Sequence, residues 1–200
     1  MKPFSEQILY FRQHPPTNLK ELTLQPAIVP DIAFGGHGFS GKFPDGLIKN
    51  MDIVFKAQCP CGGSIFTIQA KSEHDEINYY QSLVIAEQYF FSCSSCGKQS
   101  LLFDPMQHGY NPEVSRLEEW SDDELELPVS KLEVPEKVCC ACATCQENEM
   151  ELIIRLEYHN DLIGYEAFAG REENFFSWFS VVGKCSNCSE LNLFIDCECA

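Results

Sequence analysis

The sequence predicts a mainly β protein, α+β with few short helices, built from two tandem antiparallel modules related by internal duplication. Three observations support this prediction. Cysteine pairs recur at a domain-sized interval, β-type segments lie between them, and an apolar segment that ends in aspartate follows each set of pairs. The pairs are Cys59 with Cys61, Cys93 with Cys96, Cys142 with Cys145, and Cys185 with Cys188.

The residues around the second pair of each set support the duplication. Asp104 follows Cys96 at the same offset at which Asp196 follows Cys188, and the residues before each aspartate are apolar. Aromatic and β-branched residues precede both pairs, as is typical of a buried strand. We therefore expect equivalent strands on both sides of these pairs.

A second match lies between the two pairs of each set. The apolar segment that begins at Ile65 matches the one that begins at Leu152, and polar residues follow both. His74 and His159 fall among these polar residues, each close to an aspartate. The alignment predicts that the two histidines occupy equivalent positions.

Composition divides the chain into four parts. The first part lacks cysteine and is rich in proline and glycine, and its residues from Pro3 to about Arg12 have the apolar spacing of a short helix. An acidic connector separates the modules, and Asn111 followed by Pro112 predicts a short helix reaching about Trp120. The predicted parts are an N-terminal segment 1–50, a first module 51–104, a connector 105–137 and a second module 138–200.

Each set of four cysteines has the composition of a closed metal site. Zinc prefers four soft ligands at tetrahedral corners, and two tight turns facing each other across a small sheet supply them. Modules of this size need such a staple because their hydrophobic cores are small. We therefore expect two structural zinc ions. The predicted ligands are Cys59, Cys61, Cys93 and Cys96 in the first module and Cys142, Cys145, Cys185 and Cys188 in the second.

In these motifs the chain resembles the zinc-ribbon class. The motifs are Cys59-Pro-Cys61-Gly with Cys93-Ser-Ser-Cys96-Gly, and Cys142-Ala-Thr-Cys145 with Cys185-Ser-Asn-Cys188, and they cover about the last three quarters of the chain. The resemblance implies a structural zinc between two turns on a small antiparallel sheet. It implies no single function, because one fold class supports many functions.

The residues that follow the cysteine pairs distinguish the two predicted sites. A turn around a metal often needs a positive φ directly after its second ligand, and glycine adopts this conformation without strain. Gly62 and Gly97 occupy this position in the first module, whereas Gln146 and Ser189 occupy it in the second. We therefore expect the second site to be looser.

Charge favours a protein partner over a nucleic acid. The chain carries 14 Lys plus Arg against 30 Asp plus Glu, which gives a formal net charge of -16 at pH 7. Phosphates would be repelled by this charge, and no stretch of the sequence concentrates Lys and Arg. The predicted function is non-catalytic: a zinc-binding protein that binds another, basic protein, for example as its inhibitor or immunity-type partner.

The N-terminal residues predict no secretion. The first residues are polar, and the apolar stretch from Ile8 to Phe11 is too short for a signal peptide. No apolar run approaches the roughly 18 residues that a membrane span requires. A cytoplasmic location, with reduced and metal-loaded thiols, is therefore expected.

Two alternative functions involve other residues. His74 and His159 would serve an enzyme with a cleft between the modules, although zinc with four thiolates has no open coordination position for catalysis. Four surplus cysteines would serve a thiol-based redox or metal-responsive regulator, bind a further metal, or be buried apolar side chains. These are Cys139, Cys140, Cys197 and Cys199.

Overall fold

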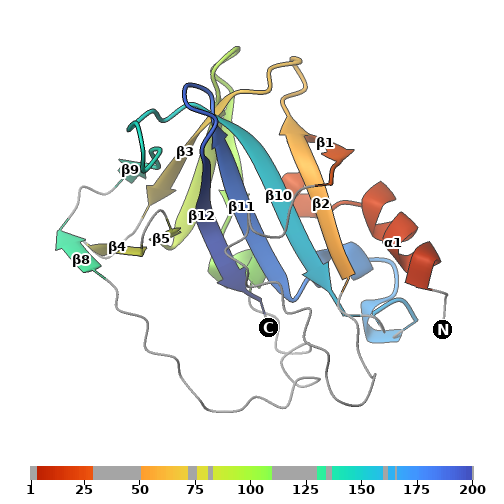
Figure 1. The fold of residues 1–200 in the computed structure, drawn as a ribbon. Coiled ribbons are helices and arrows are strands. Elements are labelled where there is room, and N and C mark those ends of the chain that lie inside the picture. The colour runs from red at the N-terminus through yellow and green to blue at the C-terminus, as the bar shows by residue number, and fades with distance from the viewer. Residues whose placement is uncertain are drawn as a thin grey trace.

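The computed structural model describes residues 4–28, 51–71, 76–80, 83–109, 130–133, 137–159, 162–164 and 166–199. The predicted class is confirmed, because this part of the chain is mainly β, with a nine-stranded antiparallel sheet curled into a half-barrel (Figure 1). The large sheet contains β1 (Thr23–Pro26), β2 (Met51–Gln58), β3 (Phe66–Lys71), β6 (Gln88–Cys93), β7 (Gln99–Phe103), β9 (Lys137–Cys139), β10 (Met150–Tyr158), β11 (Trp178–Cys185) and β12 (Leu191–Glu198). A three-stranded sheet contains β4 (Glu76–Tyr80), β5 (Leu83–Ile85) and β8 (Ser130–Glu133).

Helices are short and lie at the margins of the sheet. The predicted N-terminal helix is confirmed as α1 (Phe4–Gln13), whose Phe11 ring stacks on Tyr158 of β10 with centroids 3.8 Å apart. No helix in the described ranges is long and apolar enough to cross a membrane. The helix predicted in the connector lies outside the described residues. The remaining helical turns are η1 (Thr17–Leu19), η3 (Pro105–Gly109), η4 (Glu166–Phe168) and η5 (Glu172–Asn174).

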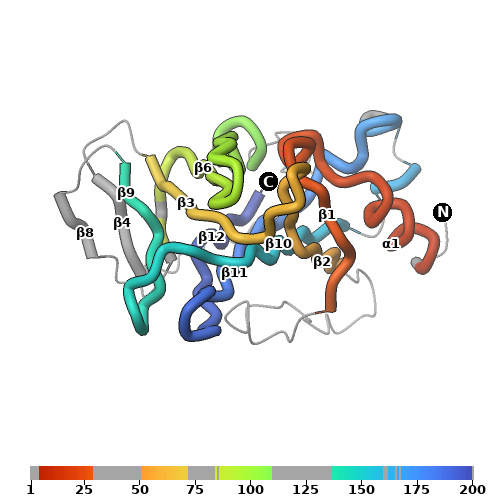
Figure 2. The backbone as a smooth tube through the Cα atoms, turned by 90° about the horizontal axis from the view of Figure 1, so that it is seen from above, coloured from red at the N-terminus to blue at the C-terminus, as the bar shows by residue number. Residues whose placement is uncertain are grey.

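The large sheet consists of two groups of strands that meet at one residue pair. One group has the order β1-β2-β10-β11-β12, and the other has the order β9-β3-β6-β7. They join where Met150 at the start of β10 pairs with Phe66 at the start of β3. Both strands lie near the middle of the molecule when it is viewed from above (Figure 2).

The duplication is visible in the register of the strands. β3, β6 and β7 pair in succession in one group, as β10, β11 and β12 do in the other. Phe66 pairs with Cys93, and Met150 pairs with Cys185, so the register aligns Phe66 with Met150. The alignment that began the second segment at Leu152 was therefore wrong in register by three residues, because the residues from Leu152 to Ile154 are all apolar and lack the alternation that fixes the face and register of a strand.

In each set of four cysteines, the strand that leads into the first pair and the strand that leads into the second pair belong to different groups of strands. β2, which leads to Cys59, pairs with β10, whereas β9, which leads to Cys142, pairs with β3. Strand pairing thus crosses between residues 51–104 and 138–200 in both directions. The boundaries of these two ranges remain a prediction.

Both exchanged strands pair in the same register. Lys56 of β2 is opposite Ile153, and Cys139 of β9 is opposite Gln69. Lys56 and Cys139 each precede the first cysteine of a set by three residues, and Ile153 and Gln69 each follow the pair that joins the groups by three residues. The two halves are therefore related by a pseudo-twofold arrangement around the Phe66–Met150 pair.

A single hydrophobic core joins the two groups. Buried apolar residues from both groups belong to one large contiguous cluster, to which alternate residues of β2 contribute, and only Ile153 and Val182 among the described core residues form a separate small cluster. Phe103 of β7 stacks on Phe179 of β11 with ring centroids 4.2 Å apart, and both rings are fully buried. Packing as well as strand pairing therefore holds the halves together.

Candidate metal centres

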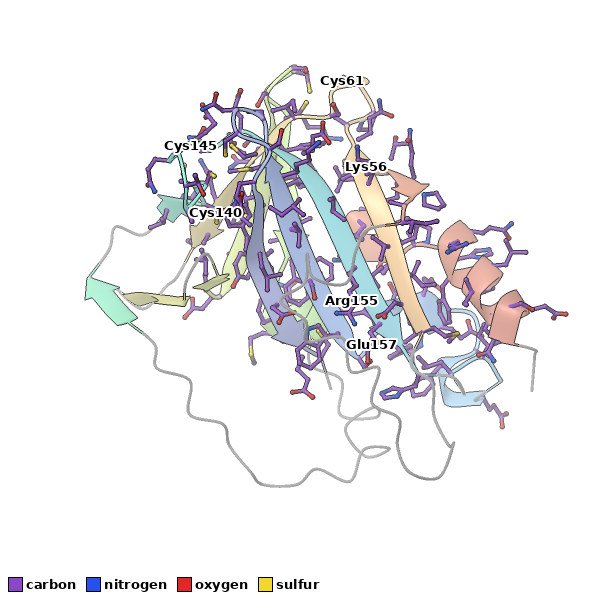
Figure 3. All side chains as sticks on the ribbon, in the orientation of Figure 1. Lys56, Cys61, Cys140, Cys145, Arg155 and Glu157 are labelled. Atoms are coloured by element: carbon purple, nitrogen blue, oxygen red, sulfur yellow. The ribbon has the colours of Figure 1, made fainter. Side chains whose placement is uncertain are left out.

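The structure brings the eight predicted ligands together as the two predicted sets of four. In each set, all four sulfur atoms lie within 4.8 Å of one another. The sets lie at the end of the sheet where the two groups of strands join, as the positions of Cys61 and Cys145 indicate (Figure 3). We call Cys59, Cys61, Cys93 and Cys96 the first cluster, and Cys142, Cys145, Cys185 and Cys188 the second cluster.

The spacing of the sulfurs fits a tetrahedral metal ion. Four sulfurs at the usual Zn–S bond length of about 2.3 Å define a tetrahedron with edges of about 3.8 Å. Five of the Sγ–Sγ distances are close to this value and the others do not exceed 4.8 Å, so the donor set fits a zinc ion. The Sγ–Sγ distances are 3.7 Å for Cys59–Cys96 and Cys61–Cys93, and 3.5 Å for Cys142–Cys188, Cys145–Cys185 and Cys145–Cys188.

Tight turns with matching backbone hydrogen bonds present the cysteines. At the end of β6 the Gly97 N–H donates to the Cys93 carbonyl, and at the end of β11 the Ser189 N–H donates to the Cys185 carbonyl. The turns that follow β2 and β9 match in the same way. Their bonds run from the Gly62 N–H to the Cys59 carbonyl and from the Gln146 N–H to the Cys142 carbonyl.

A positive φ occurs directly after the second ligand in all four turns. The φ angles are 92° at Gly62, 71° at Gly97, 62° at Gln146 and 64° at Ser189. Gln146 and Ser189 thus adopt the conformation for which glycine is favoured, at a cost of about 1–2 kcal/mol for each side chain. Weaker metal binding at the second cluster stays a prediction.

Exchanging residues at this position is expected to change stability in opposite directions. Ser189→Gly removes the strain and should raise the free energy of unfolding by about 0.5–1 kcal/mol, whereas Gly97→Ser should lower it by a similar amount. A Cβ at Gly97 would have nothing within 4 Å, so the effect comes from the backbone. Urea unfolding at a fixed zinc concentration measures both changes. Two changes of the same sign would contradict this account.

Side chains support the second cluster in a way that the sequence analysis missed. Asn192 of β12 is 1% exposed, donates from Nδ2 to Cys142 Sγ at 3.5 Å, and accepts the Ala143 N–H at 2.9 Å. The Gln146 side chain donates to the Cys142 carbonyl. These bonds hold a turn that lacks glycine. One indication of this support was present in the sequence: Asn192 is a polar residue inside an apolar strand, and a buried polar group needs a hydrogen-bond partner.

The turns favour thiolates at buried cysteines of both clusters. Burial opposes ionisation of Cys93, but backbone N–H groups of its own turn lower its pKa to about 7. Burial also opposes ionisation of Cys142, where backbone N–H groups of the turn and the Asn192 side chain lower the pKa to about 6. Because zinc binds thiolates, these sulfurs are prepared for binding near neutral pH.

Two of the surplus cysteines lie on β9 and immediately after it. By register, Cys139 and Cys140 occupy the positions of Lys56 and Ala57 in the other half. Cys139 is exposed, whereas Cys140 is 2% exposed and belongs to the core, as Ala57 does. Cys140 therefore packs as a small apolar side chain.

The other two surplus cysteines lie at the end of β12. A Cβ added to the buried Gly109 would lie 3.5 Å from Cys199 Sγ and 3.8 Å from Cys197 Sγ, so both sulfurs lie near the same glycine. In the described ranges, no third group of three or more His, Cys, Asp or Glu side chains comes as close together as the two clusters do.

The histidines of the enzyme alternative lie away from the second cluster or outside the described residues. His74 is outside them. His159 is partly buried and directly follows β10, whose first residue, Met150, pairs with Cys185. The length of the strand places His159 roughly 30 Å from that pair.

Comparison with known proteins finds no relative: no protein-family model, no curated protein and no solved structure matches the chain. The geometry therefore defines the class of site by itself. The chain carries two tetrathiol clusters, each of which could hold a metal ion.

Proposed function

We propose that the protein binds two zinc ions, one in each cluster, and that both ions are structural. The sulfur spacing carries this proposal, because five Sγ–Sγ distances of 3.5–3.7 Å lie within about 0.3 Å of the edge of a zinc tetrathiolate tetrahedron, and all four sulfurs of each cluster lie within 4.8 Å of one another. A single iron ion accepts the same ligands, so the test must identify the metal. No other feature of the described residues supports the proposal as directly.

Zinc in these clusters would stabilise the fold and would not catalyse a reaction. Four thiolates complete its tetrahedral coordination and leave no position for water or substrate. The protein would supply the ligands from paired turns, and Asn192 would orient Cys142 through its hydrogen bond to the sulfur. Outer-shell bonds of this kind keep a metal site in one geometry.

Native mass spectrometry with elemental analysis tests zinc binding. We expect two zinc ions per chain in the natural protein, and fewer than two in Cys61→Ser. Cys139→Ser is the matched control, because Cys139 is also an exposed cysteine but lies outside both clusters, and this variant should keep two ions. Two ions retained by Cys61→Ser, or zinc lost from Cys139→Ser, would count against the assignment of ligands.

The acidic surface supports a basic protein as the partner. Two zinc tetrathiolates would bring the formal net charge from -16 to about -20. Part of this charge gathers at the second cluster, because Glu149 and Glu190 belong to its turns, where their carbonyls accept the N–H groups of Ser186 and Cys185. Complementary charge promotes association with basic surfaces and repels nucleic acid. We propose that this end of the molecule contacts such a partner.

An affinity capture from cell extract with the zinc-loaded protein tests the partner proposal. We expect a basic protein that is retained at low salt and released at high salt, and whose retention is weakened by Glu149→Gln with Glu190→Gln. Glu6→Gln with Glu166→Gln changes the net charge equally at exposed positions outside the turns, and it should weaken retention less. The absence of a salt-sensitive partner, or equal effects of both double variants, would overturn the proposal.

A further inference from the structure

We infer that the two clusters form one cooperative unit, in which zinc at either cluster raises the affinity of the other for zinc. This inference rests on the proposed function and concerns the regulation of the same sites. It comes from the exchange of β2 and β9 between the two groups of strands. In two independent modules, by contrast, each strand would pair only within its own module.

A short path of backbone pairing joins the first cluster to the second. Cys93 of the first cluster pairs with Phe66 at the start of β3. Three residues further along β3, Gln69 pairs with Cys139, which precedes Cys142 of the second cluster by three residues. The Cys140 N–H also donates to the Ile68 carbonyl. The strand that presents the first pair of the second cluster is therefore anchored on a strand that the first cluster organises.

The reverse path has the same register. Cys185 of the second cluster pairs with Met150 at the start of β10. Three residues further along β10, Ile153 pairs with Lys56, which precedes Cys59 of the first cluster by three residues. Met150 and Phe66 pair with each other, so both paths pass through the same point. Each cluster thus closes on turns whose flanking strands belong to both halves.

This arrangement makes the energies of the two sites interdependent. β9 spans only Lys137–Cys139, and within the described residues its pairing partner is β3. Without metal in the first cluster, the turn after β6 is free to open, and β3 loses support at its Phe66 end, three residues before Gln69, where its pairing with β9 begins. Ordering of Cys142 then becomes part of the cost of binding zinc at the second cluster, because a ligand that must order its site binds more weakly.

Variants that disable one cluster at a time test the coupling in the full-length chain. Cys61→Ser with Cys96→Ser replaces two exposed ligands of the first cluster, and Cys145→Ser with Cys188→Ser replaces the two more exposed ligands of the second. Competition with a chromophoric chelator measures zinc affinity at the remaining cluster. We expect each remaining cluster to bind zinc at least about tenfold more weakly than in the natural protein, and by the same factor in both variants because coupling is reciprocal.

A zinc titration of the natural protein, followed by native mass spectrometry, tests the coupling even if the variants fail to fold. At half saturation the zero-zinc and two-zinc forms should dominate over the one-zinc form. A variant that binds no zinc at all supports coupling if this pattern is found. A dominant one-zinc form, together with unchanged affinity in both variants, would refute the coupling but leave the proposed function intact. A natural protein that binds no zinc would instead refute the proposed function.

Discussion

Removal of zinc by a strong chelator is expected to unfold the protein. A structural zinc site contributes on the order of 10–16 kcal/mol to its folded state, whereas the whole stability of a typical domain is about 5–15 kcal/mol. The loss of two ions therefore exceeds what the hydrophobic core can offset. Several ligands are themselves exposed, including Cys61, Cys96 and Cys188, so the metal rather than burial must fix their turns.

Circular dichroism in the far and near ultraviolet measures this unfolding. The near-ultraviolet signal of the buried aromatic residues should collapse on chelation and return when zinc, but not magnesium, is added in excess. Cooperative urea unfolding should disappear from the chelated sample. A chelated protein that keeps its near-ultraviolet spectrum and a sharp unfolding transition would show that the core alone holds the fold.

Truncation of one aromatic ring in the core is expected to produce the second large effect. Phe179 is 0% exposed, stacks on Phe103, and contacts Phe176 with ring centroids 5.7 Å apart. Phe179→Ala should lower the free energy of unfolding by about 3–5 kcal/mol, because it removes buried apolar surface and leaves a cavity. Since Phe103 and Phe179 belong to different groups of strands, the loss should weaken contact between the halves.

Urea unfolding of the zinc-loaded protein measures this loss against a matched control. Leu191→Ala also truncates an apolar side chain in a strand of the large sheet, but Leu191 is 37% exposed. Its substitution should change the free energy of unfolding by about 0.5 kcal/mol or less. A loss below about 1 kcal/mol in Phe179→Ala would mean that the rings do not form a shared core.

Local sequence patterns were sufficient to predict the cysteine clusters and seven strands, β2, β3, β6, β7, β10, β11 and β12, but not β1, β9 or the three-stranded sheet. Alternating burial in β2 follows directly from its alternating apolar residues, and the repeated cysteine pairs predicted which four sulfurs gather in each cluster. Both features depend on short spacings along the chain, which sequence periodicity records. The class of fold and the composition of each site were therefore predictable.

The partners of the strands were not predictable in the same way. Consecutive strands pair more often than not, a rule that favours β3 as the partner of β2. β2 pairs instead with β10, which lies much further along the chain, and nothing in the residues of β2 indicates this partner. The register error between Ile65 and Leu152 has a related origin, because the residues from Leu152 to Ile154 are all apolar and lack the alternation that would fix their face and register.

The supports of the second cluster were missed for a different reason. Gln146 and Ser189 adopt positive φ angles although neither is glycine, and bonds from Gln146 and Asn192 to Cys142 reinforce one of these turns. Sequence rules for turns consider only the intrinsic preference of one residue for a given φ angle. They do not include a hydrogen bond from a side chain on a distant strand, which can offset a local cost of about 1–2 kcal/mol.

X-ray absorption at the zinc edge tests the central claim most directly, because it reports the atoms bound to the metal. For a protein loaded with two zinc ions, we expect four sulfur neighbours per zinc at about 2.3 Å and no contribution from nitrogen or oxygen. A shell that includes nitrogen or oxygen, or fewer than four sulfurs per ion, would contradict closed tetrathiolate sites.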